Sequence, residues 1–149
     1  MIPTCLKRET FPEKFNPSLR DVLEVMDQIL IDDFEPSLEI QSEQLHSSLQ
    51  IVISQLLIAR LNDTISEGSG DWLVSHFIKG ASDAEVLISQ RLSGDVYHNY
   101  ELFGGIYEIR TACLVDQKTI TEAVQWYLEF GNLNPNLTWI PYDEGVRPT

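Results

Sequence analysis

The stretch VYHNYELFGGIYEIRTACLVDQKTITEAVQWYLEFG, residues 96–131, decides the fold class of this chain. Its first part predicts a β-hairpin, with a strand from Val96 to Phe103, a turn at Gly104-Gly105 and a return strand from Ile106 to Val115. Its second part predicts an amphipathic helix, because Asp116 is a good N-cap and Gly131 suits a left-handed C-terminal position. Strands followed directly by a helix indicate an α+β protein.

The N-terminal region predicts one further helix after an unstructured start. Residues 1–15 contain Pro3 and Pro12 and show no periodicity, so we expect an irregular lead-in. A helix then opens at Asn16-Pro17-Ser18, where Ser18 and Asp21 have capping-box spacing. Its apolar face has helical spacing and is formed by Leu19, Val22, Leu23, Met26, Ile29 and Leu30.

The middle of the chain allows two interpretations. Alternating apolar residues favour two strands that turn near Ser54-Gln55, preceded by a short strand over residues 38–40. Residues 42–62 contain no Gly or Pro, so one long helix also fits. A strand is predicted over residues 72–78, and residues 86–92 fit a strand or a short helix.

The C-terminal end predicts a turn at Asn134-Pro135-Asn136, a short strand over residues 137–140 and a polar tail over 143–149. The chain is therefore expected to be one α+β domain, residues 16–142. Its sheet should be largely antiparallel, with an N-terminal helix and a C-terminal amphipathic helix followed by a short strand. Structural roles are expected for Gly104, Gly105, Phe130, Gly131 and Trp139, the last as an anchor under the helix.

Charge is the most informative property of the composition. Ten Lys and Arg stand against 23 Asp and Glu, a net charge of −13 over 149 residues. Such a surface repels nucleic-acid phosphates and anionic lipid but attracts a basic protein, although solubility alone also explains it. No signal peptide or membrane-spanning stretch is visible, so we expect a cytoplasmic protein with its two cysteines, Cys5 and Cys113, reduced.

The sequence offers little chemistry. The three histidines, His46, His76 and His98, lack ligand spacing, and no hydrolase, metalloprotease or phosphate-loop motif is present. The carboxylate pairs fall in predicted loops, where solvation keeps their pKa ordinary. We therefore expect no catalytic residue, metal or cofactor. The competing hypothesis is a small enzyme or ligand-binding domain that uses His76, His98 and Glu101 in a pocket.

The C-terminal third resembles a known family. The segment 116–139 is similar to the end of the Imm-one family of polymorphic-toxin immunity proteins, which closes with an amphipathic helix, then Phe, Gly, Pro and Leu-x-Trp. Those positions here are Phe130, Gly131, Pro135, Leu137 and Trp139. The spacing of apolar residues from Leu49 to Asp63 also resembles the central hairpin of a family member that neutralises a DNA deaminase toxin.

The resemblance implies an α+β immunity protein that binds the C-terminal domain of a cognate bacterial toxin and blocks its active site. The toxin would be a deaminase or nuclease with a basic substrate channel, which an acidic inhibitor can occupy. An acidic adaptor for another basic protein remains the alternative, and the oligomeric state stays open. On expected exposure, the contact residues are Asp63, Glu67, Asp71, Trp72, Tyr97, Tyr100 and Glu101.

Overall fold

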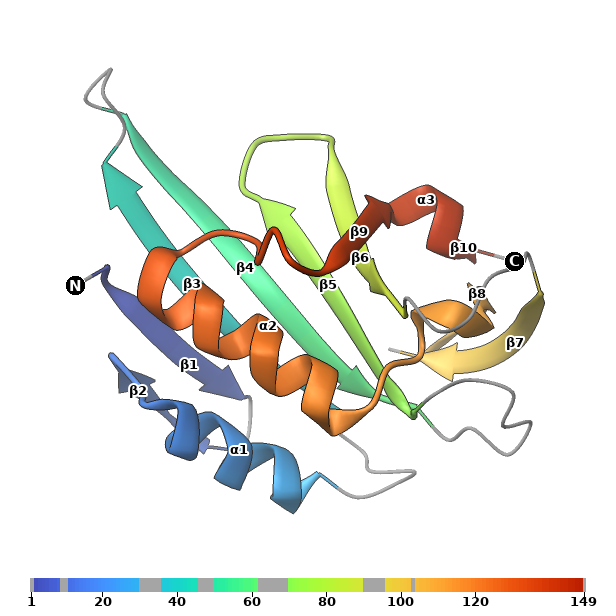
Figure 1. Cartoon of the computed structure of the whole chain (residues 1–149), viewed down its shortest axis with the longest axis horizontal. Coiled ribbons are helices and arrows are strands. Elements are labelled where there is room, and N and C mark those ends of the chain that lie inside the picture. The colour runs from blue at the N-terminus through green and yellow to red at the C-terminus, as the bar shows by residue number, and fades with distance from the viewer. Residues whose placement is uncertain are drawn as a thin grey trace.

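Two antiparallel sheets and two main helices make up the molecule (Figure 1). The computed structural model describes residues 2–8, 11–29, 36–45, 50–61, 70–89, 96–102 and 104–148. The larger sheet has seven strands in the order β2-β1-β3-β4-β5-β6-β9, and the smaller sheet has the order β10-β8-β7. The strands of the two sheets are β1 (Thr4–Arg8), β2 (Phe11–Phe15), β3 (Ser37–Leu45), β4 (Ile51–Arg60), β5 (Trp72–Ile78), β6 (Ala84–Ile88), β7 (Tyr97–Leu102), β8 (Gly105–Arg110), β9 (Thr138–Pro141) and β10 (Val146–Pro148).

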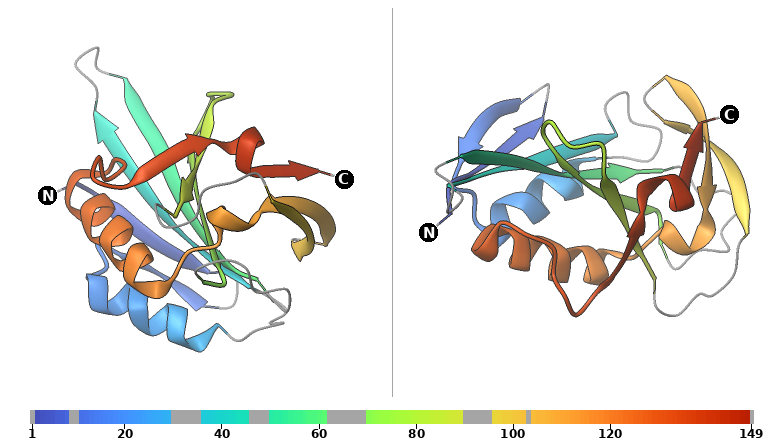
Figure 2. Two further views of the ribbon diagram at one scale, coloured as in Figure 1. Left: turned by 45° about the vertical axis from the view of Figure 1, so that its right-hand side comes forward. Right: turned by 90° about the horizontal axis from the view of Figure 1, so that it is seen from above.

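The two main helices, α1 (Leu19–Gln28) and α2 (Gln117–Phe130), lie on one face of the large sheet (Figure 2). Both begin at the predicted caps. Ser18 and Asp21 form the capping box of α1, and the Asp116 side chain accepts the Thr119 backbone N–H of α2. Gly131 ends α2 in the left-handed conformation, at φ 69°. These local predictions are confirmed, and so is the α+β class.

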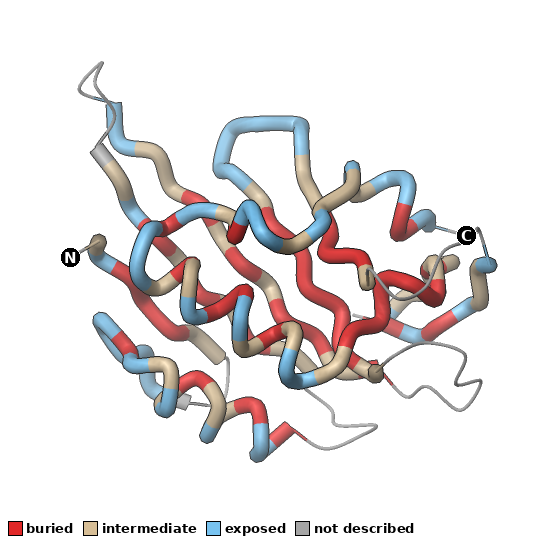
Figure 3. Tube along the Cα trace, viewed as in Figure 1, coloured by how far each residue is buried: buried red, intermediate tan, exposed pale blue. Residues whose placement is uncertain are grey.

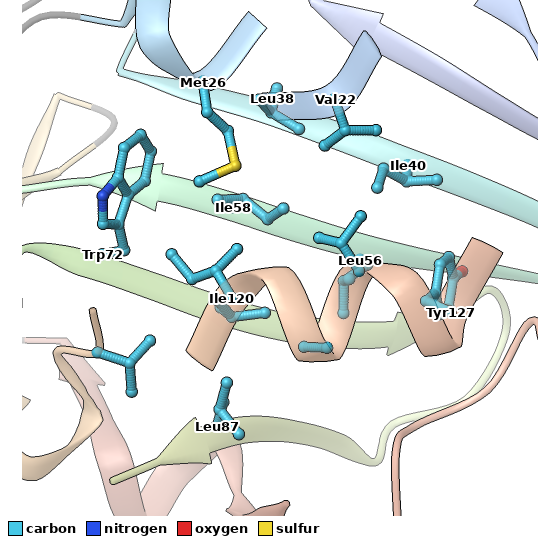
Figure 4. Packing of buried hydrophobic residues seen from close by; sticks show 14 of the residues in the cluster. Val22, Met26, Leu38, Ile40, Leu56, Ile58, Trp72, Leu87, Ile120 and Tyr127 are labelled. Atoms are coloured by element: carbon cyan, nitrogen blue, oxygen red, sulfur yellow. The ribbon is translucent and has the colours of Figure 1, made fainter. Parts of the chain in front are cut away.

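The main core lies between these helices and the large sheet (Figure 4). Strand side chains alternate between faces, so β3 directs Leu38 and Ile40 toward the helices, while β4 directs Leu56 and Ile58 the same way. Two short elements, the 3₁₀ helix Thr111–Cys113 and α3 (Tyr142–Gly145), flank the small sheet. The core residues fully or nearly buried here include Val22, Met26, Ile29, Trp72, Val74, Leu87, Ile120, Val124 and Tyr127.

The small sheet covers part of the opposite face of the large sheet. Its inward side chains join the β4–β6 end of that face in a second core, which holds Ala59, Leu73, Tyr100, Ile109 and Val146. Both faces of the large sheet are therefore buried at this end, as the buried segments in Figure 3 show. The other end of the face, over β1 to β4, has no such layer among the described residues.

Both ends of the chain are structured, contrary to the sequence prediction. The expected lead-in forms the β1–β2 hairpin, and the expected polar tail forms α3 and β10. Val146 of this tail is buried and pairs with Ile109, which makes the tail a strand of the small sheet. Prolines obscured two of these strands, because Pro12 lies in β2 and Pro148 in β10; both are edge strands, where proline is tolerated.

Two further predictions require correction. Ser54 and Gln55 do not form a turn, because β4 runs without interruption from Ile51 to Arg60. Apolar residues lie on both faces of its second half because both faces are covered there, which obscured the period-two pattern. The long helix is likewise excluded for the described part of 42–62. In the β7–β8 hairpin, Leu102 pairs with Gly105, so Gly105 already belongs to the return strand and, of the two glycines, Gly104 at φ 75° is the one in the turn.

Candidate functional site

The expected contact residues do not form one exposed surface. Trp72 is 4% exposed and Tyr100 is 5% exposed, so both are core residues and the prediction of exposure is wrong for them. Trp72 is buried because its strand directs it toward α1 and α2, while Tyr100 points into the second core. Asp63 and Glu67 lie outside the described residues. Glu101 is exposed on β7, as expected.

Asp71 has a structural partner. Its carboxylate accepts the Arg60 Nε–H at 2.8 Å, and the same guanidinium donates to the Ile29 carbonyl at 2.7 Å. Arg60 also lies 5.4 Å from the centre of the Trp72 ring. Asp71 therefore helps to hold the end of α1 against β4 and β5, which explains why it is half-buried.

Tyr97 is also engaged within the molecule. Its hydroxyl donates to the Glu144 carbonyl at 2.7 Å and accepts from an Arg147 N–H at 3.1 Å. The Arg147 guanidinium carbon lies 4.2 Å from the ring centre, a cation–π contact. These contacts join α3 and β10 to β7. The Tyr97 ring thus fastens the C-terminal segment to the small sheet.

Two of the residues assigned structural roles lie near the C-terminal end of the main core, Trp139 on β9 and Phe130 at the end of α2. Trp139 is half-buried against the main core, and its indole N–H donates to the Asn134 carbonyl at 3.2 Å. Phe130 is partly exposed, with its ring centre 4.4 Å from that of Trp126. The Gln44 amide donates to the Phe130 carbonyl at 2.7 Å and so ties the end of α2 to β3.

One broad surface was missed by the sequence prediction: the uncovered part of the large sheet, opposite the helices. We call it the open face. Strand register assigns side chains to it, since Lys7 pairs with Glu39, Glu39 with Leu57, Gln41 with Gln55, and Gln55 with Phe77. All side chains on this face are set by the same alternation. It comprises Cys5, Lys7, Glu13, Phe15, Glu39, Gln41, Glu43, Ile51, Ile53, Gln55, Leu57 and Phe77.

The open face has an apolar side on β4 and β5 and an acidic side on β2 and β3. Ile53, Leu57 and Phe77 are half-exposed, with the Phe77 ring 5.3 Å from that of Tyr142, and Phe15 is 72% exposed on the edge strand. Its charged side chains are three glutamates and Lys7, whose ammonium lies 3.9 Å from the Glu13 carboxylate. Burial, and then the Glu13 charge, raise the pKa of the nearby Cys5 thiol. The face is thus suited to contact a protein, and its surplus charge is negative.

A signal for this face was present in the sequence. In β3, the polar residues Glu39, Gln41 and Glu43 alternate with Leu38 and Ile40, which is the pattern of a strand with one solvent-exposed side. The sequence prediction covered only residues 38–40 of this strand. It therefore identified the strand but missed the alternation that marks its exposed side.

The competing ligand-site hypothesis meets an obstacle in the geometry. His76 lies on β5 of the large sheet, whereas His98 and Glu101 lie on β7 of the small sheet, and Glu101 is exposed. The three residues therefore do not share one sheet. His76 instead pairs with Glu85, with 3.1 Å between Nδ1 and Oε2. Its Nε2 is buried and has no hydrogen-bond partner among the described residues.

His76 belongs to a buried polar cluster beneath α2. The Tyr127 hydroxyl lies 2.6 Å from the Ser54 hydroxyl, and the Tyr127 ring stands edge-on to His76 with 6.1 Å between centres. Burial raises the pKa of Tyr127 to about 12, with Ser54 opposing the shift. Tyr127 is fully buried and His76 is 6% exposed, so this cluster lies in the core under the helix.

A groove of about 360 Å³ lies between α1 and the β1–β2 hairpin. Its charges are largely paired: Lys14 contacts Asp21 at 2.8 Å, and Arg20 contacts Glu24 at 3.1 Å beside it. The hydrogen bond from Lys14, followed by those from Ser18, lowers the pKa of Asp21 to about 2. The groove therefore displays few uncompensated charges to a ligand.

Comparisons of the chain with protein-family models, with curated proteins and with solved structures find no match. Across the described ranges, no helix is both long and apolar enough to cross a bilayer. The same ranges contain no cluster of three or more His, Cys, Asp or Glu residues placed to hold a metal ion. Any inference about what the molecule binds must therefore come from its own surfaces.

Proposed function

We propose that this chain is a non-catalytic binding protein that occludes a basic protein with its open face. The observation that carries the proposal is a sheet face on which half-exposed apolar side chains of β4 and β5 lie beside glutamates of β2 and β3. Protein interfaces likewise combine apolar side chains with polar ones that stay accessible to solvent. The net charge of −13 adds long-range attraction, which accelerates encounter with a basic partner.

The partner we favour is the C-terminal domain of a bacterial toxin that acts on nucleic acid. Such a domain needs a basic channel for its substrate, and an acidic sheet face can fill that channel in place of phosphates. The resemblance of residues 116–139 to immunity proteins supports the same choice. On this proposal the chain acts in the cytoplasm of the toxin-producing cell and protects it without turnover.

The test compares two charge reversals. Glu43 lies on the open face and Glu129 on α2, and both are exposed. Each Glu→Lys substitution removes one negative charge and adds one positive charge, which changes the net charge from −13 to −11. We expect Glu43→Lys to weaken binding of the toxin domain encoded beside this chain at least tenfold and Glu129→Lys to change it less than twofold.

Binding is measured by calorimetry at two salt concentrations, and protection by growth on toxin co-expression. Equal losses in the two variants would show that only total charge matters and would refute the open face as the site. Failure of the wild-type chain to bind or protect would refute toxin neutralisation itself. Binding of a different basic protein through Glu43 would instead support the adaptor alternative.

A small-ligand site is the second candidate function, and the unpartnered Nε2 of His76 is the observation that favours it. Its burial beneath α2 means that a ligand would need the helix to move. A His76→Gln substitution separates the two functions, because it lies on the helix side of the sheet. It should leave partner binding unchanged, whereas loss of a ligand or a turnover activity would favour the second candidate.

A further inference from the structure

Strand β7 is the edge of the small sheet, with β8 as its only paired strand among the described residues. The register pairs Tyr97 with Arg110, and just before this pair the Thr111 N–H donates to the Val96 carbonyl at 2.9 Å. Hydrogen-bonded and non-hydrogen-bonded pairs alternate along an antiparallel ladder. The backbone N–H and C=O groups of Tyr97, Asn99 and Glu101 therefore point away from β8, toward the free edge.

The other three sheet edges are protected by proline. Proline cannot donate to a ladder, and natural sheets use it to prevent unwanted strand pairing. β7, with the sequence YHNYEL, contains neither proline nor lysine and is six residues long. The protected edges are β2 with Pro12, β9 with Pro141 and β10 with Pro148.

We infer that β7 is a strand-addition site that binds an extended, basic segment of a partner protein. Three outward N–H groups and three outward C=O groups are enough to hold a short strand in register, and this mode of recognition uses main-chain bonds for affinity. The site belongs to the small sheet and does not depend on the open face. It adds a second contact, made by backbone groups and therefore tolerant of the partner's sequence. The open face, by contrast, selects its partner by charge.

Charge identifies the occupant. On the outer face of the small sheet, Glu101 is exposed and Glu108 lies opposite Asn99. Two cations, Arg110 opposite Tyr97 and Arg147 of β10, lie at the other end of this face, and the Arg147 guanidinium contacts the Tyr97 ring. A second copy of the chain would bring another 13 negative charges to the edge, which opposes self-pairing. A strand with lysine or arginine on its outer face complements the half of β7 that contains Asn99 and Glu101.

The probe for the test is the capped hexapeptide Lys-Val-Lys-Val-Lys-Val, which presents lysines to the outer face and valines to the inner one. With ¹⁵N-labelled protein, we expect amide shifts centred on Tyr97, Asn99 and Glu101, and hydrogen exchange of those amides slowed at least fivefold. The Glu-Val counterpart should bind at least tenfold more weakly. Shifts confined to other strands, or equal binding of both peptides, would overturn the inference.

Two variants make the test specific. Asn99→Pro removes an outward N–H without removing a β7–β8 hydrogen bond and should abolish peptide binding, whereas Asn99→Ala keeps that N–H and should bind within twofold of wild type. Should Asn99→Pro unfold, Glu101→Lys replaces it and should reverse the preference toward the Glu-Val peptide. Concentration-dependent dimerisation that Glu101→Lys abolishes, without peptide binding, would assign the edge to a second copy and refute the basic partner.

Discussion

Substituting alanine for two glycines separates the cost of a backbone conformation from the cost of a steric clash. Gly131 and Gly104 have similar left-handed φ angles, 69° and 75°. They differ in their surroundings. A Cβ on Gly131 would lie 2.0 Å from Nε2 of Gln44 and 2.8 Å from the Ser42 hydroxyl, whereas a Cβ on Gly104 would meet nothing within 4 Å.

The magnitudes follow from these contacts. The left-handed conformation costs an alanine about 1 kcal/mol, and this term is common to both variants. At Gly131 the Gln44 side chain must also move, which breaks its 2.7 Å hydrogen bond to the Phe130 carbonyl and adds about 1–2 kcal/mol. We therefore expect Gly104→Ala to lose about 1 kcal/mol of unfolding free energy and Gly131→Ala about 2–3 kcal/mol.

Urea unfolding followed by circular dichroism measures the difference. With a slope typical of small domains, the two midpoints should differ by roughly 0.5–1 M urea. The Gln44→Ala background provides the control, because the hydrogen bond to Phe130 is already absent there, so Gly131→Ala should cost less in that background than in the wild-type chain. Equal destabilisation of the two single variants would refute the packing of Gln44 against the end of α2.

Three further predictions concern the caps and the buried titratable groups. Ser18→Ala should cost about 1 kcal/mol in urea unfolding, because α1 loses its capping box, and no change would contradict the cap geometry. The pKa of Tyr127 is about 12 in the fold against 10 for the free side chain, so the stability it contributes is complete below pH 10 and is lost as the pH rises toward 12. Tyr127→Phe should therefore flatten the decline of the urea midpoint over that range, and an unchanged slope would exclude Tyr127 as its source. Burial raises the pKa of Cys113 to about 12, which leaves roughly one thiol in ten thousand ionised at pH 8. Cys113 should react with a disulfide reagent only in urea, and fast reaction of Cys113 in the folded protein would contradict its burial.

The two surfaces of the proposals make different demands on a partner. The open face requires a broad, basic surface, whereas β7 requires a short extended segment. A toxin domain that contacts both would bridge the large and small sheets. The Glu43→Lys and Asn99→Pro variants separate these contributions, since one changes a side chain on the large sheet and the other a backbone group on the small sheet.

The local sequence was sufficient for the features whose causes lie within a few residues. Ser18 with Asp21, Asp116 and Gly131 set the ends of both helices through hydrogen bonds and backbone conformation that depend on immediate neighbours. The β7–β8 hairpin followed in the same way from its glycines, with an error of one residue in the turn and a return strand that ends at Arg110 where Val115 was predicted. The α+β class was predictable because helix signals and runs of strand signals occupy separate segments of the chain.

The tertiary structure alone decided which sides of the strands are covered. Trp72 and Tyr100 look like exposed interface residues in sequence, but both are buried. Trp72 lies where α1 and α2 pack on the large sheet, and Tyr100 lies where the two sheets pack together. The open face arises for the converse reason, since the small sheet covers only the β4–β6 end. Burial is a property of which distant segments pack together, and a pattern that repeats every two residues identifies the two sides of a strand without telling which side will be covered.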